Sequence, residues 1–89
     1  MGSLENIKIE RLREVEVKGY DGDFNLVIVQ LKESNDGIII YKVCLELRHD
    51  GKLIDIIKIQ TNYDRVKSDS YFSNLESRYP EERITRKIF

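Results

Sequence analysis

The chain reads Ile38-Ile-Ile-Tyr-Lys-Val-Cys-Leu-Glu-Leu-Arg-His49-Asp50-Gly51-Lys52-Leu-Ile-Asp-Ile-Ile-Lys-Ile-Gln60 in its middle. Two runs rich in Ile, Val, Leu and Tyr flank an Asp-Gly pair. Asp and Gly readily take the positive φ angles of a tight turn that matches the twist of two antiparallel strands. The pattern therefore predicts a β-hairpin with its turn at Asp50 and Gly51, and the shorter remaining segments pair with it or pack on it.

The size and charge of the chain limit what it can be. Its 89 residues suit one small domain, because a chain of this length buries only about 60–65% of its unfolded surface. We expect a single α+β domain over residues 1–89, with residues 1–5 disordered or left from a cloning vector. Fifteen basic and 16 acidic residues give a net charge of -1, so no overall field attracts nucleic acid or an anionic membrane.

Residues that often carry chemistry are scarce. The one cysteine, Cys44, lies in an apolar run and is predicted to be a small buried side chain. One cysteine and no signal peptide indicate a cytoplasmic protein. The longest apolar run, Ile38 to Tyr41, is far shorter than the roughly 20 residues that span a bilayer, so we expect no membrane segment. With one His and one Cys, the sequence predicts no metal site and no cofactor.

Four strands are predicted to form an antiparallel meander. They cover Ile7 to Lys18, Phe24 to Glu33, Ile38 to Arg48 and Leu53 to Thr61. Leu12 breaks the alternation of the first segment. One long strand, or two short strands that meet at a bulge near Arg11 to Arg13, would fit. A helix from Leu4 to Leu12 is the competing interpretation, and strand is preferred.

Polar segments with glycine join these strands at residues 19–23 and 32–37. In the last strand, Ile54 and Ile56 alternate out of phase with Ile57 and Ile59. Either a bulge at Ile56-Ile57 brings all four to one side, or the strand is buried on both faces. Residues 60–67 lose the period of two and predict a loop, where functional side chains would lie.

The tail after this loop is predicted to be helical. Ser68 or Asp69 can cap a helix that runs to Tyr79, with apolar residues three and four positions apart. Pro80 ends this helix or begins a second one. Residues 84–89 fit either a helix or a short edge strand, and helix is preferred.

One such helix covers only one face of a four-stranded sheet. We assign the odd-numbered residues from Ile39 to Leu47 to the core beneath it. The second face carries Ile38, Ile40 and Lys42, and its apolar residues require a partner. A symmetric dimer is the commonest way to bury such a patch, so we expect a homodimer with Ile40 near its axis.

The sequence names no reaction, and we expect a small non-enzymatic binding or regulatory protein that acts through protein–protein contacts as a homodimer. Tyr and Arg are enriched at interface hot spots. The predicted partner-binding residues are Ile38, Ile40, Lys42, Tyr63, Arg65 and Tyr71. The alternative is a small metal-independent ribonuclease or RNA-binding protein, because aromatic and basic residues interleave in the C-terminal region. Nucleic acid is the less favoured partner.

Catalysis by such a ribonuclease would rest on His49, Tyr63, Arg65 and Lys67. These side chains can move protons and stabilise a phosphorane without a metal. His49 precedes the fourth strand and the other three follow it, so about ten extended residues separate them by roughly 30 Å within one protomer. The site would require the loop to fold back or a second protomer to contribute.

Overall fold

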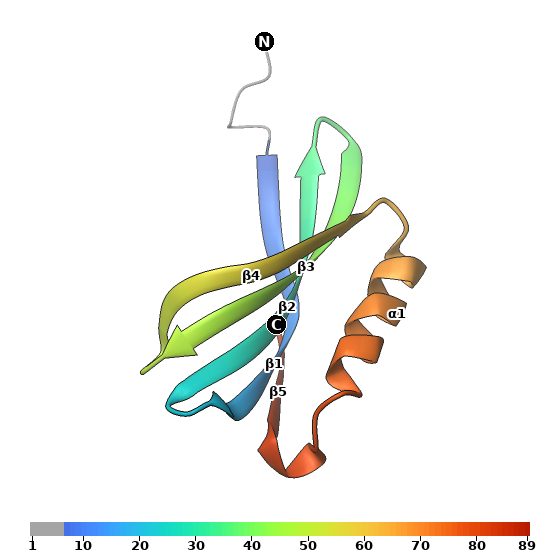
Figure 1. Ribbon diagram of the computed structural model, residues 1–89. Coiled ribbons are helices and arrows are strands. Elements are labelled where there is room, and N and C mark those ends of the chain that lie inside the picture. Colours follow the sequence, from blue (N-terminus) through green and yellow to red (C-terminus); the bar gives the residue numbers. More distant parts are fainter. Residues whose placement is uncertain (1–6) are drawn as a thin grey trace.

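A computed structural model describes residues 7–89, which form a five-stranded antiparallel sheet with one α-helix packed on it (Figure 1). The expectation for residues 1–5 lies outside the described residues. The elements are β1 (Ile7–Asp21), β2 (Phe24–Asn35), β3 (Ile38–His49), β4 (Lys52–Asn62), α1 (Arg65–Glu76), the 3-10 turn η2 (Glu81–Arg83) and β5 (Ile84–Ile88). The strand order is β4-β3-β2-β1-β5. The predicted antiparallel meander is confirmed for the first four strands.

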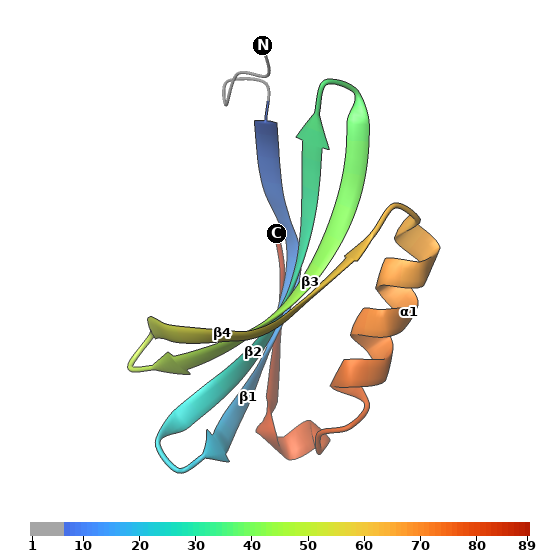
Figure 2. The same cartoon turned by 45° about the horizontal axis from the view of Figure 1, so that its top comes forward.

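The fifth strand corrects the prediction of four strands and of a helical segment at residues 84–89. β5 pairs antiparallel with β1, from Val17↔Ile84 to Arg13↔Ile88. Two views show how α1 leaves β4 at one edge and runs along one side of the twisted sheet, so that β5 reaches the opposite edge (Figures 1 and 2). The edge of β1 offers backbone hydrogen-bonding groups there. The alternation of apolar residues within residues 84–89 does not show that β1 has a free edge. The sequence therefore favoured a helix where the structure has a strand.

Two-residue turns connect the central strands. Asp36-Gly37 and Asp50-Gly51 both have positive φ at both positions, 50° and 84° in the first pair and 51° and 75° in the second. This is the geometry of a type I′ turn, whose twist suits a hairpin. The predicted turn at Asp50 and Gly51 is confirmed. The turns predicted over residues 19–23 and 32–37 were too long, because the strands extend to within two residues of each other.

We expect Gly51→Val to cost about 1–2 kcal/mol of unfolding free energy, because a β-branched residue is strained at positive φ. A Cβ atom added at Gly51 meets nothing within 4 Å, so backbone strain is the whole cost. Urea unfolding at fixed protein concentration measures it. Lys52→Val, at the exposed first residue of β4, is the control and should move the midpoint little. Equal midpoints for the two variants would contradict this account of the turn.

Register shifts set the facing of side chains in β1 and in the outer strand β4, which has two of them, at Ile54 and at Ile57. Leu12 is the extra residue of β1, between the pairs Arg11↔Leu31 and Arg13↔Gln30. Each of the two alternatives is therefore right in part, because β1 is one long strand and has the bulge that was expected between two short ones. In β4 the register shifts between the partners Ile56 and Lys58. This is the bulge predicted at Ile56-Ile57, and the alternative of burial on both faces is wrong because β4 is exposed.

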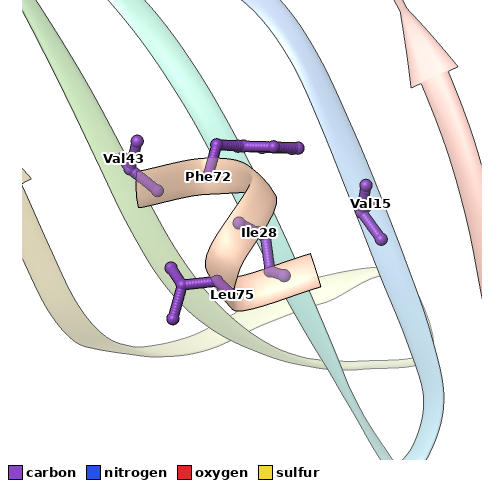
Figure 3. Packing of buried hydrophobic residues seen from close by; sticks show 5 residues of the cluster. All are labelled: Val15, Ile28, Val43, Phe72 and Leu75. Carbon is purple, nitrogen blue, oxygen red and sulfur yellow. The ribbon is translucent and has the colours of Figure 1, made fainter. Parts of the chain in front are cut away.

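The hydrophobic core lies between α1 and the sheet. Val15, Ile28 and Val43 come from three neighbouring strands and pack beneath Phe72 and Leu75 of the helix (Figure 3). Phe72 and Leu75 are three residues apart and therefore share one face of the helix. Val43 belongs to the face of β3 that was predicted to be the core.

The helix begins earlier than predicted. Asp64 is its N-cap, and the Asp64 carboxylate accepts a hydrogen bond from the backbone N–H of Val66 at 2.9 Å. The loop predicted over residues 60–67 is therefore wrong, since only two residues separate β4 from α1. Ser68 and Asp69, which were predicted to cap the helix, lie inside it instead, because Asp64 is the N-cap.

Candidate functional site

The four residues considered for catalysis lie at two ends of β4. His49 pairs with Lys52 at the β3–β4 turn, whereas Asn62, just before Tyr63, pairs with Tyr41 at the far end of the ladder. The His49 ring lies 5.2 Å from the ring of Phe24. Within one protomer, the structure therefore does not bring His49 together with the other three residues.

The other three candidates lie at the start of α1. Tyr63 is 77% exposed. The Arg65 guanidinium lies 5.8 Å from the centre of the Tyr41 ring and forms an ion pair of 3.8 Å with Asp69. Lys67 is exposed. These contacts attach Arg65 to the sheet and helix surface and assemble no proton-transfer pair with His49.

The predicted partner-binding residues are spread over both faces of the sheet. Ile38 is 61% exposed on the second face, which is the face opposite α1. Ile40 is half-buried there, and Lys42 forms an ion pair of 2.8 Å with Glu33. Tyr71 instead packs against the core under α1. They do not form one continuous patch.

The centre of the second face is charged. Arg48 Nη2 lies 2.5 Å from Glu46 and 3.8 Å from Glu14, which also binds Arg11 at 3.0 Å. Because β2 lies between β3 and β1, the Arg48–Glu14 pair crosses over β2. Long charged side chains can cover apolar surface with their carbon stems. The paired charges therefore account for apolar residues that are buried on a face without a helix, namely Val27, Val29 and Cys44.

A hollow of about 420 Å³ lies over this charged centre, between the β3–β4 turn and the C-terminal residues. Its floor carries two arginines and two glutamates that already bind one another. Lys87 lines the hollow as well, so its lining carries three positive and two negative side chains. The two arginines are already paired, and Lys87 alone does not define a ligand.

The apolar surface of the sheet lies instead along its edge. We define the β4 row as the five aliphatic residues of β4 that are 44–54% exposed, namely Leu53, Ile54, Ile56, Ile57 and Ile59. Three of them face the second side, since they pair with Arg48, Glu46 and Cys44 of β3. The predicted meander already placed this strand at an edge of the sheet, and the structure confirms that position.

Gln30 forms a polar cluster inside the core that the sequence did not indicate. Its side-chain amide donates to Ser68 Oγ at 3.0 Å and to Asp69 Oδ1 at 2.8 Å. Arg13 Nε donates to Gln30 Oε1 at 2.9 Å, and the Arg13 guanidinium stacks 4.0 Å from the centre of the Phe72 ring. Every polar atom of Gln30 is thus used within the fold, so the cluster joins α1 to the sheet and offers nothing to a ligand.

Cys44 is a buried free thiol, as predicted. Burial raises the pKa of the Cys44 thiol, and the nearby Glu46 carboxylate adds to this increase. The thiolate is the nucleophilic form, so this environment suppresses reactivity. No group of three or more His, Cys, Asp or Glu side chains within residues 7–89 is placed to hold a metal ion.

Arg86 of β5 joins the strand to the helix and to η2. Its guanidinium donates to Glu76 at 2.7 Å and to both carboxylate oxygens of Glu81, at 2.9 Å and 2.6 Å. The hydrogen bond from Arg86 lowers the pKa of the Glu81 carboxyl. An arginine held by two carboxylates has few donors left for an RNA phosphate.

Comparisons of this chain with models of known protein families, with curated proteins and with solved structures find no match. None of the helices within residues 7–89 is long and apolar enough to cross a membrane.

Proposed function

We propose that this protein is a small non-enzymatic binding protein that acts through protein–protein contacts made by β4. The observation that carries this proposal is the β4 row, five half-exposed aliphatic side chains on the outermost strand of the sheet. Isolated apolar residues on a surface are ordinary, but a contiguous group along one element is typical of an interaction site.

The backbone of β4 supports the same proposal. Among residues 7–89, β4 pairs only with β3. The outer side of an edge strand presents N–H and C=O groups that can pair with a strand of another chain. Affinity would come from these hydrogen bonds, and specificity from the side chains of the row.

The two edges of the sheet differ in how they are protected. β5 has five residues, and its middle carries Thr85, Arg86 and Lys87. Short strands and charges are common ways to keep an edge from pairing. β4 has 11 residues and five exposed aliphatic ones, against the single exposed Ile88 of β5, and the charges and two bulges of β4 protect it only in part. An edge of this kind is a liability unless a partner covers it, so we assign the binding role to β4 and not to β5.

The ribonuclease or RNA-binding alternative has less support. His49, the one histidine that could act in catalysis, lies at the opposite end of β4 from Tyr63. Arg86, one of the basic residues of the C-terminal region, is engaged by two glutamates. RNA binding is therefore kept as the competing outcome of the experiment below.

A photo-crosslinking amino acid at position 57 tests the proposal in the cells that make this protein. Position 57 lies in the β4 row, and we expect irradiation to give a covalent adduct with protein, either a second copy or another chain. The matched control is position 66, because Val66 is also apolar and is 72% exposed, but lies on α1. We expect no adduct there.

Mixed-sequence RNA supplies the competing measurement. Binding followed by fluorescence anisotropy should be absent for the wild-type protein at both 20 and 200 mM salt, concentrations chosen because phosphate contacts lose affinity steeply over roughly this range. Salt-sensitive RNA binding together with no protein adduct at position 57 would overturn the proposed function.

A further inference from the structure

We propose that the chain bound by β4 is a second copy of this protein, in an antiparallel β4–β4 pairing with a two-fold axis between Ile56 and Ile57. This inference rests on the proposed function, because it names the partner of the same strand. It also moves the dimer axis from Ile40, where the sequence placed it, to the edge of the sheet.

The sequence of β4 is self-complementary in this register. Asp55 lies opposite Lys58 of the partner subunit, and Lys58 lies opposite Asp55 of the partner subunit. Ile56 lies opposite Ile57 of the partner subunit, and Ile54 opposite Ile59 of the partner subunit. Cross-strand pairs of opposite charge and of β-branched residues are those that stabilise antiparallel sheets. An isologous interface requires this kind of self-complementarity.

The bulge at Ile57 makes the charge pair sterically consistent. Residues three apart in a regular strand point to opposite faces. Here Asp55 pairs with Leu47 and Lys58 with Leu45, so both lie on the face that α1 covers in part. A two-fold axis perpendicular to the sheet keeps the helix-side faces of both copies on one side. Asp55 and Lys58 of the partner subunit therefore meet on the same side of the joined sheet.

Neighbouring registers lack this match. A shift by one residue places Asp55 opposite Ile57 or Ile59 of the partner subunit, and Lys58 opposite Ile54 or Ile56 of the partner subunit. Each charge would then face an aliphatic side chain without an opposite charge, which is unfavourable. A shift by three residues places Asp55 opposite Asp55, or Lys58 opposite Lys58, and like charges repel. The proposed register is the one that satisfies charge and packing together.

The resulting dimer explains why the β4 row is exposed in one chain. The two sheets join into one continuous sheet, and the aliphatic residues of the two rows cover each other near the axis. The pairing in this register spans Ile54 to Ile59. Beyond it, the register shift at Ile54 puts Leu53 on the second face, whereas Gln60 lies on the face that α1 covers. The dimer also pairs outer backbone groups of β4 that the single chain leaves at an edge, apart from the Ile56 N–H, which donates to Asp55 Oδ1 at 2.8 Å within one chain.

Charge reversal tests the register by sedimentation equilibrium of the purified chain. The wild-type protein should be a dimer at micromolar concentration. Asp55→Lys and Lys58→Asp should each weaken dimerisation at least about tenfold, because each puts like charges opposite each other at two symmetric places. The double variant, Asp55→Lys with Lys58→Asp, restores opposite charges and should recover most of the affinity. Glu82→Lys, an equal charge reversal at an exposed residue of η2, is the control and should change nothing.

Ile57→Lys provides an independent variant. It introduces a charge beside the axis and should give a monomer, while circular dichroism checks that the sheet is retained. The proposed pairing would be overturned if Ile57→Lys remained a dimer. It would also be overturned if the double variant dimerised no better than the two single charge-reversal variants. A monomeric wild-type protein would overturn the second copy as the partner. In that case an adduct at position 57 with a different protein would leave the proposed function standing, so the two failures are distinguishable.

Discussion

Phe72→Ala is expected to lower the free energy of unfolding by about 3–5 kcal/mol, the usual cost of removing a large aromatic side chain from a core. Phe72 is fully buried, with Val15, Ile28 and Val43 in the same cluster and the Arg13 guanidinium over its ring. The loss combines the apolar area of the ring with the cavity that the surrounding strands cannot fill, because a sheet is too stiff to collapse onto the helix.

The size of this effect is large for such a domain. Small domains have total stabilities near the low end of about 5–15 kcal/mol, and 1 kcal/mol shifts Tm by roughly 4–8 °C at this size. Thermal unfolding should therefore show a fall in Tm well above about 10 °C. Val66→Ala is the control, because Val66 lies on the same helix but is 72% exposed. It should change stability by less than about 0.5 kcal/mol. All samples need one protein concentration, since dimerisation raises apparent stability by mass action.

Gln30→Leu is expected to cost about 1–3 kcal/mol, although leucine is apolar and similar in size to glutamine. The cost arises because Ser68, which is fully buried, loses its partner. Arg13 also loses an acceptor at 2.9 Å. A buried polar group without a hydrogen bond bears the full cost of its lost hydration. No buried side-chain nitrogen or oxygen atom of residues 7–89 lacks a partner in the wild-type chain, so the substitution creates a defect that the native fold does not have.

A double-mutant cycle with Ser68→Ala separates this explanation from simple loss of packing. Ser68→Ala alone should cost less than Gln30→Leu, since one of the two Gln30 amide hydrogens still binds Asp69 and only the other loses its acceptor. Gln30→Leu combined with Ser68→Ala should be less destabilised than the sum of the two single variants, because no hydroxyl then remains unpaired. Urea unfolding of the four proteins gives the coupling free energy. Strict additivity would mean that the amide–hydroxyl bond contributes nothing to the attachment of α1.

The charged centre of the second face shows where sequence patterns mislead about exposure. Alternation placed Ile38 and Ile40 on that face and predicted an apolar patch that requires a partner. In the structure the ion pairs of Arg48 lie over the middle of the face, whereas five exposed aliphatic residues lie together along β4. Alternation assigns a residue to a face, but it does not say which long side chains of neighbouring strands will fold over that residue.

Only some features of β4, the candidate binding strand, could be predicted from the sequence. The out-of-phase isoleucines of the fourth strand indicated the bulge at Ile56-Ile57, because a bulge is a local event that reverses a local period. The predicted meander also placed β4 at an edge. Whether its faces would be buried was undecided, since a strand that is apolar on both sides can also be covered on both faces.

Local sequence was sufficient wherever the determining contacts are local. The Asp50-Gly51 turn, the long β1 with its bulge and the core face of β3 follow from φ preferences and a period of two over a few residues. Only the tertiary structure decided the rest. Residues 84–88 became a strand because β1 had an edge to offer, and Gln30 entered the core because Ser68 and Asp69 lie above it. Each of these outcomes depends on residues more than 15 positions apart in the chain, a separation at which patterns within a single segment carry no signal.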